Sequence, residues 1–300
     1  MDRSLLLTIW LPMFVACSPA PPSIEDATVI DSGVSPAAGA SNGGATERGA
    51  GGSRAALAVG EGSGRGSGAS GGMVDLGSNG KLDIYPIGDS ITLGTNGGYR
   101  NVVFTKLMAD GYDVDMLGSL NDQWTSAADK DHEGHGGMGT GAILENLDAW
   151  MAHLPDPDLV LLMIGTNELA WDYGRPAMEA VGRLDTIIDK LFEAQPTVTV
   201  IVGSIPPLTP KEVLIDTKPV QRADAVNAYN ALAKARVKER ARAGERIAFA
   251  EVNRALSVAD LVDGVHPTPE GYVKVGNAFY EAARSALSTP QVVISLAERD

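Results

Sequence analysis

The sequence predicts a three-layer α/β/α domain built on a five-stranded parallel sheet. Between residues 81 and 287, five short apolar segments alternate with five segments of helical pattern. A strand followed by a helix, repeated in this way, builds a parallel sheet covered by helices. Residues 159–164 and 198–202 are continuous runs of aliphatic or β-branched residues, which are typical of strands buried on both faces.

The elements follow in a regular order. The expected strands cover residues 82–87, 112–117, 159–164, 198–202 and 247–250. The expected helices cover residues 98–110, 141–153, 175–194, 222–243 and 269–287. The helix over residues 222–243 shows the clearest amphipathic pattern, with Lys and Arg on one face. Its other face carries Val226, Tyr229, Ala233 and Val237.

Composition argues against several classes of protein. The 300 residues include 24 Lys+Arg and 38 Asp+Glu, a net charge of −14. Nucleic-acid binding requires clustered cations to neutralise phosphates, so we expect no nucleic-acid partner. A single cysteine excludes an internal disulfide and a multi-thiolate metal site. The negative charge also argues against tight adsorption to anionic membranes.

Glycine is concentrated before the predicted domain. Residues 33–80 hold 16 of the 35 glycines, interleaved with Ser and Ala. Such a stretch buries too little apolar surface to offset its chain entropy, so we expect residues 18–80 to form a disordered tether. A glycine-rich ligand loop is the alternative, but no strand precedes this stretch to orient one. The domain should then span residues 81–287 as one unit, with a tail over residues 288–300.

The N-terminus has the pattern of an export signal. Arg3 precedes a 12-residue apolar run, residues 5–16, which is too short to span a membrane. Residues 1–17 are therefore predicted to be a signal peptide. Export would place the domain outside the cytoplasm.

The only cysteine follows this apolar run directly. Phe14-Val15-Ala16-Cys17 resembles a bacterial lipobox, although Leu is usual where Phe14 stands. The resemblance implies that Cys17 is lipidated and anchors the protein to a bacterial cell envelope. The alternative is a simple signal peptide cut near Ala16 or Ala20 and a freely secreted protein. A lipid on Cys17 is the only membrane contact that we expect.

Candidate catalytic residues follow the strands, where open parallel sheets bind ligands. The first strand leads into Gly88-Asp89-Ser90. A serine on a tight turn at a helix start exposes its hydroxyl beside free backbone N–H groups, which suits a nucleophile. An ordinary helix cap at Asp89 or Ser90 is the equally simple alternative.

A histidine and a carboxylate stand together before the last helix. Asp263 precedes His266 by three residues, and a short loop can turn the carboxylate onto one imidazole nitrogen. The second nitrogen would then serve as a general base toward Ser90. Alone, the pair would read as an ordinary surface loop. Together with Ser90 it provides nucleophile, base and orienting carboxylate.

Acyl transfer also needs hydrogen-bond donors for the developing oxyanion. Asn167, after the third strand, offers a neutral amide with two hydrogens. The glycine-rich loop expected over residues 131–139 offers unhindered backbone N–H groups.

In their order and strand-end settings, these four blocks resemble those of the SGNH hydrolases, the GDSL-type esterases and lipases. The resemblance spans about residues 81–287, most of the folded region, and implies a flavodoxin-like sheet. It implies that Ser90 is the nucleophile, His266 the base and Asp263 its partner. Ser90 N–H, Gly137 N–H and the Asn167 amide would form the oxyanion hole. Gly134 and Gly136 compete with Gly137 for that place.

Further motifs are similar to the carbohydrate esterase family 3 branch, whose members deacetylate xylan. They are Tyr99-Arg100, Leu117-Gly118-Ser119 and His132-Glu133-Gly134-His135. Met138 departs from the aromatic residue common there, which leaves the substrate open. We interpret His132, Glu133 and His135 as a substrate loop. A zinc site is the alternative, but the spacing is not the His-Glu-x-x-His of a helical site.

Together, the export signal and the resemblance predict an exported serine esterase that deacetylates carbohydrate. We expect it to act as a monomer and to need no cofactor or metal. Its partner would be an acetylated polysaccharide or another small ester. Trp124 and Trp171 fall near the blocks and could stack on sugar rings or simply pack at the rim. Two alternatives use the same fold: a lipase or lysophospholipase, and a non-catalytic glycan-binding lipoprotein, whose Ser90 a fluorophosphonate would not label.

Overall fold

The structure is a computed structural model that describes residues 79–122, 126–171 and 173–288. The predicted signal peptide, Cys17, the tether up to residue 78, Trp124 and the tail from residue 289 lie outside these residues. No helix among the described residues is both long enough and apolar enough to span a membrane.

The described residues form a mixed α/β fold around a mostly parallel sheet of seven strands. Its strand order is β10-β7-β5-β1-β4-β3, and β2 also pairs with β1. All pairs are parallel except β3 with β4. The strands are β1 (Leu82–Gly88), β2 (Val114–Met116), β3 (Leu120–Asn121), β4 (Asp131–Gly134), β5 (Leu159–Met163), β7 (Thr199–Gly203) and β10 (Ile247–Ala250).

Two short strands share one edge of β1. β2 pairs with its first half, where Leu82 lies opposite Val114, and β4 with its end, where Ile87 lies opposite Glu133. The sheet therefore has the five parallel positions predicted, in the order 2-1-3-4-5 typical of flavodoxin-like folds. The expectation of a loop over residues 131–139 was wrong for residues 131–134. Their polar sequence gives no apolar strand signal.

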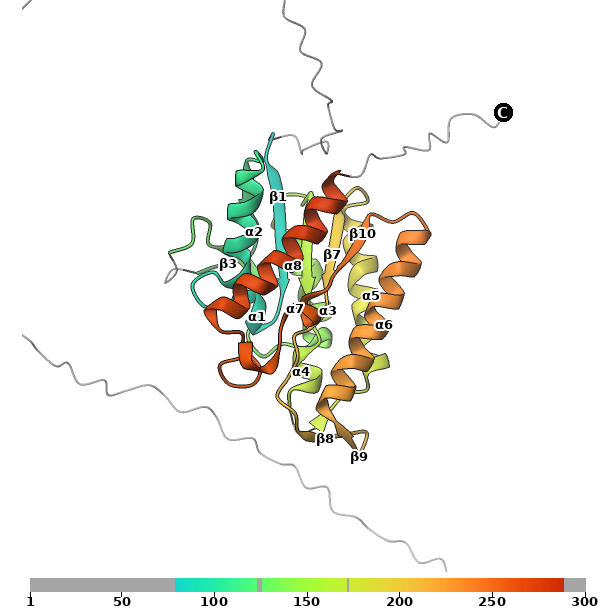
Figure 1. The fold of residues 1–300 in the computed structure, drawn as a ribbon. Helices are drawn as coiled ribbons and strands as arrows, with labels where there is room; N and C mark the ends of the chain where they lie inside the picture. Colours follow the sequence, from blue (N-terminus) through green and yellow to red (C-terminus); the bar gives the residue numbers. More distant parts are fainter. Residues whose placement is uncertain (1–78, 123–125, 172, 289–300) are drawn as a thin grey trace, which may run out of the picture. The chain divides into compact units, whose positions relative to one another are not determined.

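Helices cover both faces of the sheet. Figure 1 shows α2 and α8 side by side on one face; α3, α5 and α6 pack on the other. Side chains alternate along β5, so that Leu161 faces α2 and α8 while Val160 and Leu162 face the opposite helices. The long helices are α2 (Gly98–Ala109), α3 (Thr140–Met151), α5 (Ala177–Ala194), α6 (Arg222–Arg242) and α8 (Pro269–Ser288). Each lies within two residues of its predicted bounds.

A small second sheet lies beyond the carboxyl ends of the main strands. β6 (Tyr173–Gly174), β8 (Glu212–Ile215) and β9 (Lys218–Gln221) form it in the order β6-β8-β9. The β8–β9 turn holds Asp216 and Thr217 at φ angles of 50° and 65°. These strands were not predicted, because they are short and mostly exposed and thus lack an apolar run.

Candidate active site

Ser90 lies on a turn that the sequence around it forces to be tight. β1 ends at Gly88, and Ser90 is the first residue of α1 (Ser90–Leu93). A Cβ on Gly88 would collide with the carbonyl oxygen of Met163 on β5, so only glycine fits. Asp89 caps the helix, because its carboxylate accepts the Ile91 N–H at 2.9 Å. The cap expected as an alternative is therefore present, and it leaves the Ser90 side chain free for another partner.

That partner comes from the C-terminal part of the domain's sequence. His266 Nε2 lies 2.8 Å from Ser90 Oγ, although the two residues are 176 positions apart. His266 Nδ1 lies 2.7 Å from Asp263 Oδ2. The three residues that the sequence predicted to act together are thus joined by two hydrogen bonds in one line.

The loop that holds Asp263 and His266 is fixed at its base. It lies between η1 (Val258–Asp260) and α8, and an antiparallel bridge pairs Leu261 with Pro267. The backbone N–H of His266 donates to Asp263 Oδ1 at 2.8 Å, which holds the carboxylate beside the ring. The imidazole orientation is therefore set by the loop's own backbone.

The charge of Asp263 is stabilised within this loop. Partial burial opposes the charge, but the His266 backbone N–H, the His266 ring and the Val265 N–H donate hydrogen bonds to it. Together they lower the pKa of Asp263 to about 2. Asp263 is thus a carboxylate at neutral pH and can accept the Nδ1–H of His266.

Asn167 lies at the carboxyl end of β5, on α4 (Thr166–Leu169). The chain enters α4 through Gly165, whose φ is 120° and where a Cβ would collide with the Tyr229 ring. Asn167 Nδ2 donates to Met138 O at 2.9 Å. This bond uses one of two amide hydrogens, so the second can reach a ligand.

The glycine-rich loop lies against the same turn. His135 N–H donates to Gly88 O at 2.9 Å, directly before the Asp89-Ser90 turn. Gly134 N–H donates to His132 Nδ1 at 3.1 Å, which leaves it less suited to an oxyanion. Gly137 has a φ of 78°, and a Cβ at Gly136 or Gly137 would meet nothing within 4 Å. The backbone of these two glycines therefore faces open space.

The residues interpreted as a substrate loop lie at different depths. His132 is 1% exposed and Glu133 is 0% exposed. Burial and then the charge of Arg100 lower the pKa of His132 to about 4, so this imidazole stays neutral. The His135 ring stacks on Trp150. Trp171, by contrast, is 62% exposed.

Trp150 and Tyr85 are neighbours of this loop that sequence reasoning missed. No motif marks them, because their contacts with His135 and Glu133 arise only when β1, α3 and β4 meet. Ser119, which belongs to one of the sequence motifs, donates to Glu133 from the turn between β2 and β3. Within the described ranges, no cluster of three His, Cys, Asp or Glu side chains could hold a metal ion.

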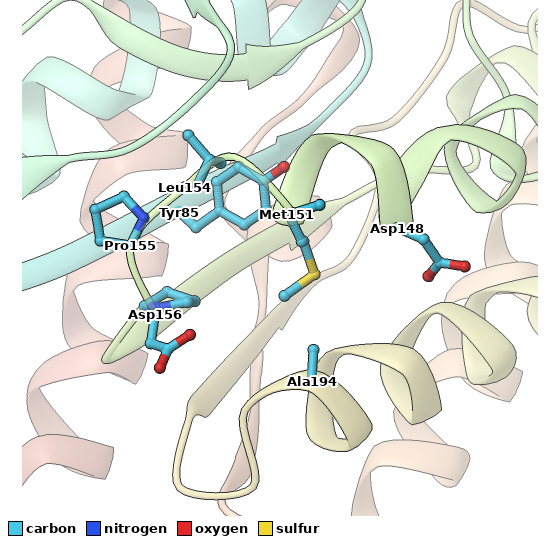
Figure 2. Close-up of a pocket in the computed structure, with 9 residues that line it drawn as sticks. Tyr85, Asp148, Met151, Leu154, Pro155, Asp156 and Ala194 are labelled. Carbon is cyan, nitrogen blue, oxygen red and sulfur yellow. The ribbon is translucent and has the colours of Figure 1, made fainter.

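Two hollows lie elsewhere on the domain. A cavity of about 240 Å³ (Figure 2) is lined by Tyr85 and by the loop at Leu154 and Pro155 that leads into β5. That loop is at the amino ends of the strands, away from Ser90. A second hollow of about 450 Å³ flanks the His266 loop, with Asn96 and Asn101 beside Val262 and Pro267.

Comparison with protein families identifies the family of the chain. The model of the GDSL-like lipase/acylhydrolase family matches residues 87–274, from the end of β1 into α8. The chain belongs to this family. As a GDSL-like acylhydrolase, it carries its Ser90, Asn167 and His266 blocks inside the matched range. The membership supports the expected class, the carboxylic ester hydrolases.

Proteins similar to this chain include esterases. A multidomain esterase of Ruminococcus flavefaciens is 28% identical over 228 residues, which are 67% of this chain and 28% of that protein. A family 3 carbohydrate esterase of Clostridium thermocellum superposes with a TM-score of 0.57 at 28% identity, over 69% of this chain and 97% of that one. One from Talaromyces cellulolyticus gives 0.59 at 26% identity, over 70% and 100%.

The Asp89 cap makes the stability of the fold depend on pH. Asp89 is fully buried, and burial raises its pKa to about 6, although the hydrogen bond from the Ile91 N–H opposes this shift. A raised pKa means that the native state holds the proton more tightly. The protonated Asp89 therefore stabilises the native state. Its contribution to the free energy of unfolding is fully present below pH 3.8 and is lost as pH rises through about 6.

Asp89→Asn should therefore gain stability relative to wild type as pH rises. The amide keeps an oxygen to accept the Ile91 N–H but has no proton to lose. Between pH 4 and pH 8, the difference in free energy of unfolding should shift in favour of the variant by roughly 2 kcal/mol. Denaturant unfolding at both pH values measures it. A difference that does not change with pH would contradict a raised Asp89 pKa.

Proposed function

We propose that this protein is an exported serine esterase that removes acetyl groups from carbohydrate. The observation that carries the proposal is the hydrogen-bonded line from Ser90 Oγ through the His266 ring to Asp263. A nucleophile, a base within reach and a group that orients the base are the parts that acyl transfer requires.

The mechanism follows from this geometry. His266 Nε2 takes the proton of Ser90 Oγ as the oxygen attacks the ester carbonyl, and Asp263 stabilises the imidazolium that forms. The carbonyl oxygen becomes an oxyanion. When the intermediate collapses, His266 returns the proton to the departing sugar hydroxyl, and Ser90 holds the acetyl group. Water then repeats the steps, releasing acetate and the free serine.

Three donors would hold the oxyanion. Ser90 is the first residue of α1, so its own N–H has no partner within the helix. Gly137 lies in the open turn, and Asn167 has an amide hydrogen beyond the one bound to Met138 O. Donors fixed in advance of the reaction stabilise the transition state without reorganisation.

Two features favour a carbohydrate ester. The superposable structures at 28% and 26% identity are family 3 carbohydrate esterases. The hollow beside the His266 loop places two amide side chains next to apolar ones, so it offers both hydrogen bonds and C–H contacts to a sugar. The proposal includes export because residues 1–17 have the pattern of a signal peptide, and it includes a lipid on Cys17 that anchors the protein to the cell envelope.

Ser90→Ala should abolish hydrolysis of 4-nitrophenyl acetate while the fold persists, because no other group replaces the attacking oxygen. Release of nitrophenolate measures the activity, and circular dichroism checks the fold. Ser288→Ala, which removes an exposed hydroxyl at the end of α8, is the matched control. Wild-type turnover in purified Ser90→Ala would rule out the proposed nucleophile.

Asn167→Ala should lower kcat for the same ester by about 10²- to 10³-fold, equivalent to about 2.7–4 kcal/mol of transition-state stabilisation. Asn146→Ala, which removes an amide that bonds only to its own helix, should keep wild-type kcat. Steady-state kinetics gives both values. An unchanged kcat in Asn167→Ala would remove this residue from the oxyanion hole.

Trp171→Ala should slow acetate release from acetylated xylan and leave hydrolysis of 4-nitrophenyl acetate unchanged. The ring is exposed and follows Asn167 by four residues, where a neighbouring sugar could stack on it. Met178→Ala removes a 71% exposed apolar side chain and serves as control. Acetate is measured across acetylated xylan, other acetylated glycans and long-chain esters. Preference of the wild type for long acyl chains would instead indicate a lipase.

A further inference from the structure

A buried carboxylate lies behind the glycine-rich turn. Glu133, which is 0% exposed, accepts hydrogen bonds from Ser119 N–H at 2.8 Å and from Ser119 Oγ at 2.6 Å. It also accepts from Tyr85 OH at 3.1 Å, and its Oε1 lies 2.5 Å from His135 Nε2. A carboxylate has about four acceptor positions, so these four contacts match its capacity. Glu133 is thus bound to the protein on every side and is not available to a substrate.

His135 is held on both ring and backbone. Its ring lies between Glu133 and Trp150, on which it stacks with centroids 4.1 Å apart and an interplanar angle of 9°. Its N–H donates to Gly88 O at 2.9 Å, and its carbonyl accepts the Met138 N–H at 3.2 Å. Only 14% of the side chain is exposed. The residue that begins the glycine turn therefore has little freedom to move.

The same turn contains one proposed oxyanion donor, the Gly137 N–H, and the carbonyl that holds a second donor, the Asn167 amide. Gly137 lies within the turn closed by His135 and Met138, and Met138 O orients the Asn167 amide. The backbone of a glycine-rich turn can adopt many conformations, and its N–H groups then point in many directions, unless contacts made by neighbouring residues fix the turn. Here, the contacts that fix them come from His135.

We propose that Glu133, His135 and Trp150 form a positioning unit that sets the Gly137 N–H and the Asn167 amide for the oxyanion. This assignment rests on the proposed esterase function and deepens it. His135 acts through the turn and not by touching the substrate. A donor displaced by about 1 Å can cost about 10²-fold in rate, so the unit should govern kcat.

Tyr85 links this unit to the centre of the sheet. Its ring forms part of the wall of the cavity in Figure 2, and its hydroxyl reaches Glu133. Burial and then the charge of Glu133 raise the pKa of Tyr85, so the hydroxyl keeps the proton that it donates. The carboxylate is therefore fixed to β1 itself, the strand that leads into the Ser90 turn.

Replacement of His135 tests the assignment. His135→Leu removes the donor to Glu133, whereas His135→Gln can place an amide N–H where Nε2 stands. With 4-nitrophenyl acetate, His135→Leu should lower kcat by roughly 10- to 100-fold with KM within about twofold of wild type. His135→Gln should recover most of that loss. His153→Leu, at an exposed histidine after α3, should match wild type.

The outcomes separate this inference from the esterase function. An inactive wild type would overturn the function itself. An active wild type with unchanged kcat in His135→Leu, or with equal loss in the Leu and Gln variants, would overturn the positioning unit. A raised KM at constant kcat would make His135 a substrate contact. If His135→Leu does not fold, Ser119→Ala, which removes one Glu133 donor, should lower kcat severalfold with KM unchanged, and wild-type kcat there would refute the unit.

Discussion

The hydrogen bond between Ser90 and His266 is the interaction on which the site depends. It joins residues 176 positions apart, which come within hydrogen-bond distance only because the folded sheet places both at the same edge. β1 delivers Ser90 at its carboxyl end, and the loop before α8 returns His266 to the same edge. α2 and α8 lie side by side, which keeps these two ends of the domain together. The packing of α2 against α8 therefore helps to hold Ser90 and His266 at their 2.8 Å distance.

Glycines allow the strand ends to approach this closely. Gly88 lies against β5 and Gly165 against Tyr229, and a methyl group at either place would push Ser90 or Asn167 out of line. Buried polar groups then supply the rigidity that glycine lacks. Asp89 caps the Ser90 helix, and Glu133 holds His135. The site combines close backbone approach with side chains that remove the remaining freedom.

Much of this architecture could be predicted from local pattern. The five parallel positions and five long helices follow from apolar runs and amphipathic spacing, and Ser90, Asn167, Asp263 and His266 from their places after strands. β4 could not be predicted, because its buried residues are His and Glu, whose burial depends on partners elsewhere in the chain. The Trp150 stack on His135 and the Tyr85 bond to Glu133 likewise exist only once distant elements have packed.

The most direct test of the account is covalent labelling of the wild-type protein by a fluorophosphonate, followed by peptide mapping. A serine activated by His266 and facing an oxyanion hole should give one adduct per chain, on Ser90, and His266→Ala should react far more slowly. No adduct, or an adduct on another serine, would contradict the assignment of Ser90 as the nucleophile.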